Sequence, residues 1–258
     1  MRTTNLIFKI IRHLRWRWRM FWSIHLPQQW LAWQLPARVQ TGPFAGMRYR
    51  RAATGSVILP KLLGSYEAEL HPFIQSLRPG QYDRMIDIGA GEGYYAVGLC
   101  YRLPEIPMLA FERSRKGRRN IRQLARLNHL EQRISVRGAC DPPALQQCLA
   151  SGGHALVIAD VEGYELELFD PEQAPALTQA DFLVELHPER VPDILAVFQT
   201  RFSASHQLEC IPRQQRKSLP EGIELPNALA QRADFLMDEF RGPQCWLTGK
   251  AQPPKPEP

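Results

Sequence analysis

Short apolar runs alternate with longer amphipathic stretches from about residue 84 to residue 250. A short apolar run is typical of a strand buried on both faces, and apolar residues every three or four positions are typical of a helix. The predicted strands are 84–88, 107–111, 134–137, 155–159, 180–188, 206–211 and 245–247. The predicted helices are 94–101, 114–128, 191–202 and 227–240. This alternation predicts an α/β fold, in which helices cover both faces of a doubly wound, mostly parallel sheet.

The N-terminal residues carry a different pattern. Residues 5–22 place apolar side chains on one face of a predicted helix and basic side chains on the other. Residues 1–66 contain eleven Lys and Arg residues and no Asp or Glu, so the net charge of +6 arises in this part of the chain. A basic, tryptophan-rich helix is typical of one that lies on an anionic membrane surface. A helix that packs on its own domain or on a second subunit has the same pattern, and so does a mitochondrial transit peptide.

Composition narrows the class of protein further. No apolar run reaches the roughly 18–20 residues that a membrane-spanning helix needs. The five cysteines are scattered without a C-x-x-C pair, which argues against a disulfide framework or a zinc site and favours a reducing compartment. Lys9 and Arg12 interrupt the apolar segment that a secretory signal would need. We therefore expect a cytoplasmic protein, with residues 5–22 as a contact to the inner face of the membrane.

A glycine-rich turn follows the first predicted strand. Gly89, Gly91 and Gly93 occupy alternate positions around Ala90, and Asp87 lies two positions before the first glycine. Glycine allows positive φ and close approach of a ligand to the backbone, and the next helix begins with N–H groups that can hold a polar group. Dinucleotide-binding turns have the spacing G-x-G-x-x-G, whereas G-x-G-x-G after an acidic residue resembles the cofactor turn of class I S-adenosylmethionine-dependent methyltransferases. These five residues are candidate cofactor contacts, and a tight turn without a ligand is the alternative.

The second and third strands supply further candidate cofactor residues. Glu112 ends the second strand, nineteen positions after Gly93, where a carboxylate can accept hydrogen bonds from both ribose hydroxyls of a nucleoside. Arg113 follows it. Ala139 and Cys140 lie in the loop after the third strand, where the adenine of such a ligand would lie.

A segment before the first strand is expected to lie against the same pocket. Ser65 is predicted to cap a helix that begins at Tyr66 and carries Glu67 in its first turn. Tyr66 and Glu67 are then candidate cofactor contacts, and an ordinary helix start is the alternative.

Acidic residues and one histidine end the fourth and fifth strands. Asp160 and Glu162 follow the fourth strand, and Glu185 and His187 end the fifth. Because ligands bind beyond the carboxyl ends of parallel strands, these side chains are expected to face one crevice. We expect Asp160 to orient cofactor or substrate and Glu162 or His187 to act as general base. The alternatives are an ordinary loop histidine and a divalent-cation site; the predicted site includes no metal, and Glu165 is expected to be structural.

Together these motifs resemble class I methyltransferases of the FkbM-like type over roughly residues 41–250. The segments that carry the resemblance are D-I-G-A-G-E-G-Y-Y (87–95), A-F-E-R (110–113), the helix that ends at Asn128, D-V-E-G-Y-E (160–165), V-E-L-H (184–187) and L-L-G-S-Y-E (62–67). The resemblance implies a Rossmann-like, seven-stranded sheet with an antiparallel last strand, S-adenosylmethionine as cofactor, and a sugar or natural-product hydroxyl as acceptor. The T-L-D-[DS] segment usual before strand four is not found here, which weakens the transfer of the acceptor class.

We expect four parts in the chain: a basic N-terminal helical extension (1–40), an entry segment over the cofactor pocket (41–80), the methyltransferase domain (81–250) and a Pro-rich disordered tail (251–258). The predicted function is O-methylation of a saccharide, a lipid-linked glycan or another small molecule. An RNA methyltransferase that uses the basic N-terminus and a membrane-peripheral binding module without turnover are the alternatives. Nucleic acid is not the expected partner, because a charged helix such as 115–126 is usually a solvated face. The sequence does not predict an oligomeric state.

Overall fold

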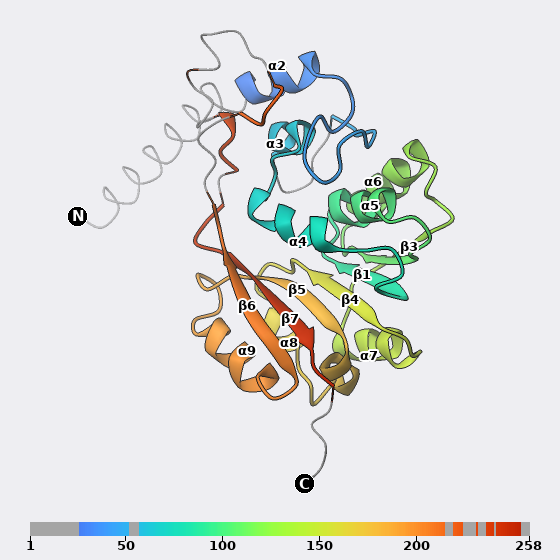
Figure 1. Ribbon diagram of the computed structural model, residues 1–258, viewed down its shortest axis with the longest axis vertical. Coiled ribbons are helices and arrows are strands. Elements are labelled where there is room, and N and C mark those ends of the chain that lie inside the picture. The colour runs from blue at the N-terminus through green and yellow to red at the C-terminus, as the bar shows by residue number, and fades with distance from the viewer. Residues whose placement is uncertain are drawn as a thin grey trace, which may run out of the picture.

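The structure is a computed structural model that describes residues 26–51, 57–214, 219–223, 231, 236–239 and 241–253. Within these residues the strands form one seven-stranded sheet with the order β3-β2-β1-β4-β5-β7-β6 (Figure 1). The first five strands are parallel to one another, and β7 is antiparallel to both of its neighbours, β5 and β6. This confirms the predicted sheet with its reversed last strand.

Most of the predicted elements are present with small shifts at their ends. The strands are β1 (Arg84–Ile88), β2 (Met108–Phe111), β3 (Ile134–Arg137), β4 (Ala155–Ala159), β5 (Asp181–Leu186), β6 (His206–Pro212) and β7 (Cys245–Ala251). The longer helices are α2 (Leu26–Gln34), α5 (Tyr94–Arg102), α6 (Arg115–Leu127), α7 (Pro142–Ala150) and α9 (Ile194–Phe202). The shorter ones are α3 (Ile58–Leu63), η2 (Ala68–Leu70), α4 (His71–Ser76), α8 (Glu165–Leu168) and η3 (Pro175–Gln179).

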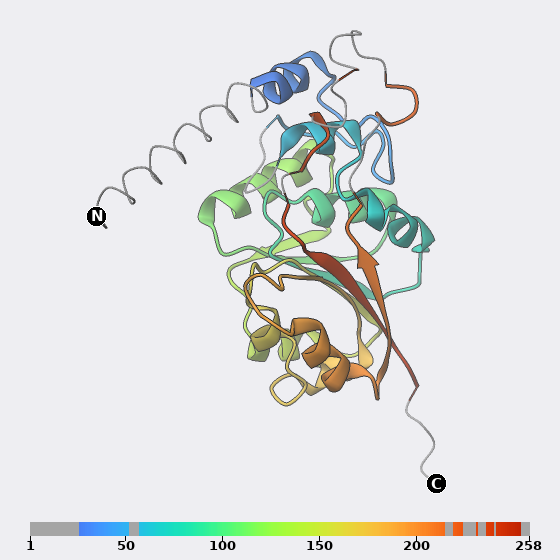
Figure 2. The same cartoon turned by 90° about the vertical axis from the view of Figure 1, so that its left-hand side faces the viewer.

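Alternate residues of the central strands face two separate cores, which is why these strands are mainly apolar. Met85 of β1 belongs to a core with α4, α5 and α6, whereas its neighbour Ile86 belongs to a core with α7, α8 and α9. Figure 1 shows these two groups of helices on opposite sides of the sheet, and Figure 2 shows the long β6–β7 pair extending along one edge. A sheet covered on both faces leaves the strand ends as the place for a ligand.

Residues 38–49 form a turn at the start of the entry segment. An antiparallel bridge joins Arg38 and Arg48, and Gly42 and Gly46 have positive φ. The side chain of Asn128, at the end of α6, accepts a hydrogen bond from Arg48 N–H and donates one to Arg48 C=O, each at 2.9 Å. The Phe44 ring lies where a Cβ of Gly98 would be, so α5 needs glycine at that position. The entry segment is therefore packed onto the α5–α6 face.

One prediction in the entry segment is wrong. Ser65 does not cap a helix at Tyr66, because α3 ends just before it with Gly64 in the left-handed region (φ 79°). The Ser65 hydroxyl donates back to the carbonyl of Pro60, and Glu67 has φ 46° before the short η2 helix. The chain thus turns sharply at the residues where a continuous helix was predicted.

Two other predictions fall on residues that the structure does not describe. The amphipathic helix at 5–22 lies outside the described residues, and so does most of the helix predicted at 227–240.

β7 continues to Ala251, the first residue of the predicted tail. Within the part of the chain that is described, none of the helices combines the length and the hydropathy that a membrane crossing requires.

Candidate active site

A cavity of about 990 Å³ lies at the carboxyl ends of β1, β2, β4 and β5. Its walls come from the turn after β1, the ends of β2 and β4, and the residues after β5 and before β7. Ligand cavities in proteins are about 300–1,000 Å³, so this one has room for a nucleoside cofactor and a small acceptor together.

The cavity collects nearly all the predicted site residues. The cofactor candidates in its wall are Tyr66, Glu67, Asp87, Gly89, Ala90, Gly91, Glu112, Arg113, Ala139, Cys140 and Asp160. The predicted catalytic residues Asp160, Glu162 and His187 line it as well. Gly93 does not: it precedes α5 with φ 97°, and an added Cβ would lie 3.3 Å from Ile121 of α6. The contact with α6 accounts for glycine at this position, and Gly93 as a cofactor contact stays a prediction.

The turn after β1 is fixed to both neighbouring strands. Gly89 and Ala90 donate backbone hydrogen bonds to Phe111 C=O, at the end of β2. Gly89 has φ 83°, and an added Cβ would overlap the carbonyl oxygen of Asp160 after β4. Only glycine allows both this φ and this close approach. The turn consequently brings the ends of β1, β2 and β4 together at the cavity.

Glu112 is held in place by backbone donors. One carboxylate oxygen accepts from Gly91 N–H at 3.0 Å and the other from Ser114 N–H at 2.6 Å. A Cβ on Gly117 would press on the Glu112 side chain, so the first turn of α6 also fixes its position. Each carboxylate oxygen has a second lone pair, so Glu112 can still accept hydrogen bonds from two hydroxyls of a ligand.

Asp87 is buried with an incomplete set of partners. Its side chain is 4% exposed, and its Oδ2 makes no hydrogen bond within the described residues. Burial raises the pKa of this carboxyl to about 7; the Ala96 N–H opposes the rise and Glu112 adds to it. A buried carboxylate with an unused oxygen suits a cationic ligand group, which would stabilise its ionised form.

Without a bound ligand, Asp87→Asn is expected to raise the unfolding free energy by about 1–3 kcal/mol at pH 8 and to change it little at pH 4. Because the folded pKa is raised to about 7, the folded protein keeps a proton that the unfolded chain releases above about pH 4. Wild-type stability therefore falls between these pH values, and the neutral asparagine removes this loss. Denaturant unfolding at both pH values measures the difference, with the exposed Asp83→Asn as control. An equal gain at both pH values would contradict the argument.

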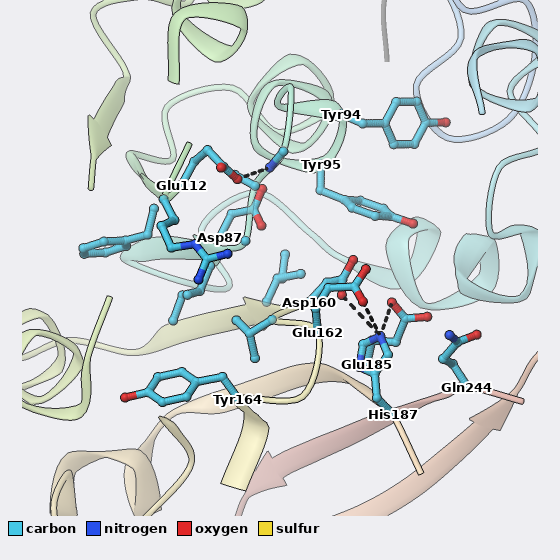
Figure 3. A pocket seen from close by; sticks show the side chains of 18 of the residues that line it. Asp87, Tyr94, Tyr95, Glu112, Asp160, Glu162, Tyr164, Glu185, His187 and Gln244 are labelled. Carbon is cyan, nitrogen blue, oxygen red and sulfur yellow. Dashed lines mark hydrogen bonds and ion pairs between the residues drawn. The ribbon is translucent and has the colours of Figure 1, made fainter. Parts of the chain in front are cut away.

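His187 faces a group of carboxylates at the opposite side of the cavity. Its Nδ1 lies 2.6 Å from Glu165 Oε1, and its Nε2 lies 3.7 Å from Asp160, 3.8 Å from Glu162 and 3.9 Å from Glu185. Figure 3 shows Asp160, Glu162 and Glu185 converging on the His187 ring, away from Asp87 and Glu112. Burial opposes protonation of the ring, but the Glu165 hydrogen bond and the nearby carboxylates outweigh it and raise the pKa of His187. Burial, with Glu185, Glu67 and Glu162, also raises the pKa of Asp160 well above its usual value.

The turn after β4 explains how Glu165 reaches His187. Glu162 and Gly163 both have positive φ, so the chain reverses before α8 begins at Glu165. The Glu165 carboxylate accepts from Gly163 N–H at 2.9 Å and is fully buried. Glu162 remains at the rim, paired with Arg190 at 2.6 Å. Glu165 therefore orients the histidine, a role that the sequence does not reveal because the two residues belong to different strand-to-helix connections.

Arg241 completes the site, and sequence reasoning missed it. Its guanidinium is ion-paired with Glu185 and with Glu69 at 2.9 Å, and it lies 3.5 Å from both Glu67 and Glu239. Burial raises the pKa of Glu67 to about 8 even though Arg241 opposes the rise. The five residues come from three distant segments, so no spacing in the sequence brings them together.

A second buried cation, Lys61, was also missed. It is ion-paired with Glu92 of the glycine turn, and the Tyr49 hydroxyl donates to Glu92 at 2.7 Å. The Lys61 ammonium lies over the ring of Tyr66, 4.6 Å from its centre. The entry segment thus reaches the cavity through Lys61 and Tyr66, with polar contacts to the glycine turn.

No protein-family model matches the chain, and no curated protein matches it. Among solved structures, the chain is similar to a precorrin-6y C5,15-methyltransferase from Geobacter metallireducens, with 12% identity, 73% of this chain and 87% of that chain covered, and a TM-score of 0.46. It is also similar to an O-methyltransferase from Bacillus cereus in complex with SAH, with 13% identity, 66% and 74% covered, and a TM-score of 0.44. A human methyltransferase 10 domain containing protein gives 12% identity, 72% and 80% covered, and a TM-score of 0.42. At these values the likenesses carry no argument about activity.

Proposed function

We propose that the chain is an S-adenosylmethionine-dependent methyltransferase of the FkbM-like type that methylates a hydroxyl of a saccharide, a lipid-linked glycan or a similar small molecule. One observation carries the proposal. One cavity has Glu112, fixed by the glycine turn, at one side. At the other side it has the His187 group, which consists of His187 and the carboxylates of Asp160, Glu162 and Glu185. Glu112 can bind the ribose of a nucleoside, and the His187 group can take up a proton.

The residues around the glycine turn fit this cofactor. Glu112 would accept hydrogen bonds from the ribose hydroxyls, and Ala139 and Cys140 would lie beside the adenine. The unused oxygen of Asp87 suits the cofactor's positive charge. When bound, the cofactor supplies a methyl group on a sulfonium, whose transfer is an in-line displacement that depends mainly on positioning.

The His187 group fits the acceptor. A hydroxyl has to lose its proton as it takes the methyl group, which calls for a base or an equivalent device nearby. Asp160 would orient the acceptor, and His187, held by Glu165, is placed to take the proton. Glu162 is paired with Arg190 and 60% exposed, so it is the weaker candidate.

The charge of the cavity favours a neutral acceptor over RNA. Carboxylates outnumber basic side chains among the lining residues, and they surround His187 on several sides. A phosphate-rich acceptor would be repelled here, whereas a polyhydroxyl compound or a cationic one would not. The proposed membrane contact of residues 5–22 stays a prediction.

Calorimetric titration with S-adenosylmethionine tests the proposal. We expect micromolar binding by the wild type and roughly 10- to 100-fold weaker binding by Glu112→Gln, since hydrogen bonds to a charged group are worth about 1.5–3 kcal/mol. Glu131→Gln, an exposed change remote from the cavity, is the matched control. Failure of the folded wild type to bind would remove the proposal and favour a binding module without turnover.

A further inference from the structure

The orientation of the His187 ring is fixed by its buried partner. The side chain is 2% exposed, and its Nδ1 lies 2.6 Å from a carboxylate oxygen of Glu165. Since a carboxylate accepts, Nδ1–H donates, and the neutral ring then carries its lone pair on Nε2. A histidine whose Nδ1–H is held by a carboxylate, with Nε2 left open, is the arrangement that commonly orients a metal-binding histidine.

The atoms in front of Nε2 are all carboxyl oxygens. Oxygens of Asp160, Glu162 and Glu185 lie 3.7, 3.8 and 3.9 Å away, beyond hydrogen-bond distance. Asp160 Oδ1 is itself buried and makes no hydrogen bond within the described residues. The His187 ring and the Glu185 side chain are buried, and a ring lone pair that faces carboxylate oxygens there is unfavourable unless a positive charge lies between them.

The spacing of these atoms suits one metal ion. Two ligand atoms that each lie about 2.1 Å from a metal are about 3.0 Å apart at a right angle and about 4.2 Å apart on opposite sides. The oxygens of Asp160 and Glu185 and the Nε2 of His187 lie within 4.8 Å of one another, with both oxygens under 4 Å from Nε2. Arg241 holds the other oxygen of Glu185, so Glu185 Oε2 remains directed at the group. A contraction of a few tenths of an ångström would complete the coordination.

We propose that Asp160, Glu185 and His187 bind one divalent transition-metal ion, with Glu165 as the residue that positions His187. One imidazole with two carboxylates favours Mn²⁺ or a similar first-row ion over Mg²⁺, which prefers oxygen ligands alone. The site itself is independent of the proposed function, but its role rests on it: the ion would lower the pKa of the acceptor hydroxyl. With His187 as a metal ligand, the proton of that hydroxyl would pass to the Glu162 carboxylate at the rim or to solvent water.

Titration of the full chain with Mn²⁺, without S-adenosylmethionine, tests the site by calorimetry and electron paramagnetic resonance. We expect one ion per chain and a nitrogen coupling from the imidazole in pulsed spectra. Asp160→Asn, Glu185→Gln and His187→Gln should each weaken binding at least 10-fold, and the nitrogen coupling should vanish in His187→Gln. Glu165→Gln should weaken binding about 10- to 100-fold and alter the coupling, which a merely structural residue would not do.

The matched control is His154→Gln. His154 lies 3.3 Å from the Asp181 carboxylate but precedes β4, at the opposite end of the sheet from the cavity. Its loss should leave Mn²⁺ binding unchanged, and circular dichroism melts identify any variant that fails to fold.

Titration of the same wild-type sample with S-adenosylmethionine separates this inference from the proposed function. If the protein binds S-adenosylmethionine but does not bind Mn²⁺, the metal site is overturned and the methyltransferase proposal stays intact. If the protein binds Mn²⁺ but does not bind S-adenosylmethionine, the metal site is supported and the methyltransferase proposal is removed. If Mn²⁺ binds equally well to the wild type, Asp160→Asn and His187→Gln, the ion lies elsewhere on the protein. This outcome overturns the inference.

Discussion

His187→Gln is expected to lower the rate of the proposed methyl transfer by about 10²- to 10⁴-fold, the range typical of a lost proton-transfer group. His187 is the buried centre of the acidic group after β4 and β5, so its loss removes either the base or the metal ligand. S-adenosylmethionine affinity should change only a few-fold, because Figure 3 places His187 across the cavity from Glu112. Single-turnover transfer of labelled methyl groups, to an acceptor found by screening, measures the effect.

The control for this rate is His206→Gln. His206 is also buried, but it lies at the start of β6 among Phe182 and Phe202 and contacts Ala180 C=O at 2.9 Å. It should lose stability without losing rate. A rate within about threefold of the wild type for His187→Gln would show that the acidic group takes no part in the reaction.

Gly89→Ala is expected to lower the unfolding free energy by about 3–5 kcal/mol and to abolish S-adenosylmethionine binding. Alanine is strained at φ 83°, and its Cβ would overlap the backbone carbonyl of Asp160, so the end of β4 has to move. Denaturant unfolding measures the stability, and calorimetry measures the binding.

Gly138→Ala provides the comparison within the same edge of the sheet. No atom lies within 4 Å of an added Cβ there, so we expect a change within about 0.5 kcal/mol. If Gly89→Ala changed the unfolding free energy as little as Gly138→Ala, the turn would not lie as close to the end of β4 as the structure has it.

The sequence predicted the sheet well because its central strands are buried on both faces and the strands are separated by clear helix signals. Ser114 and Asp141 are typical capping residues, and their side chains accept hydrogen bonds from the first turns of α6 and α7. The sequence failed at Ser65, where a capping residue follows a helix end instead of preceding a helix start. Gly64 in the left-handed region decides this, and a glycine before a serine is compatible with both readings.

The site residues that directly follow the parallel strands could be predicted from the sequence. Asp160 and His187 follow consecutive parallel strands, so the topology alone brings them together. Arg241 and Lys61 could not be found in this way, because each reaches the cavity from a segment outside the parallel strands. Glu165 can orient His187 because Glu162 has positive φ, a conformation that is uncommon for a non-glycine residue. This conformation cannot be predicted from the sequence.

The position of β7 has a consequence for how the chain folds during synthesis. β7 lies between β5 and β6, although β6 is made first. Until residues 245–251 have left the ribosome, β5 presents an unpaired apolar edge, and β6 has no correct partner. The open edge of β5 is then exposed to wrong pairing, including direct pairing with β6. Arg241 and Trp246 join the cavity wall at this last step, so an incomplete chain would lack a finished site.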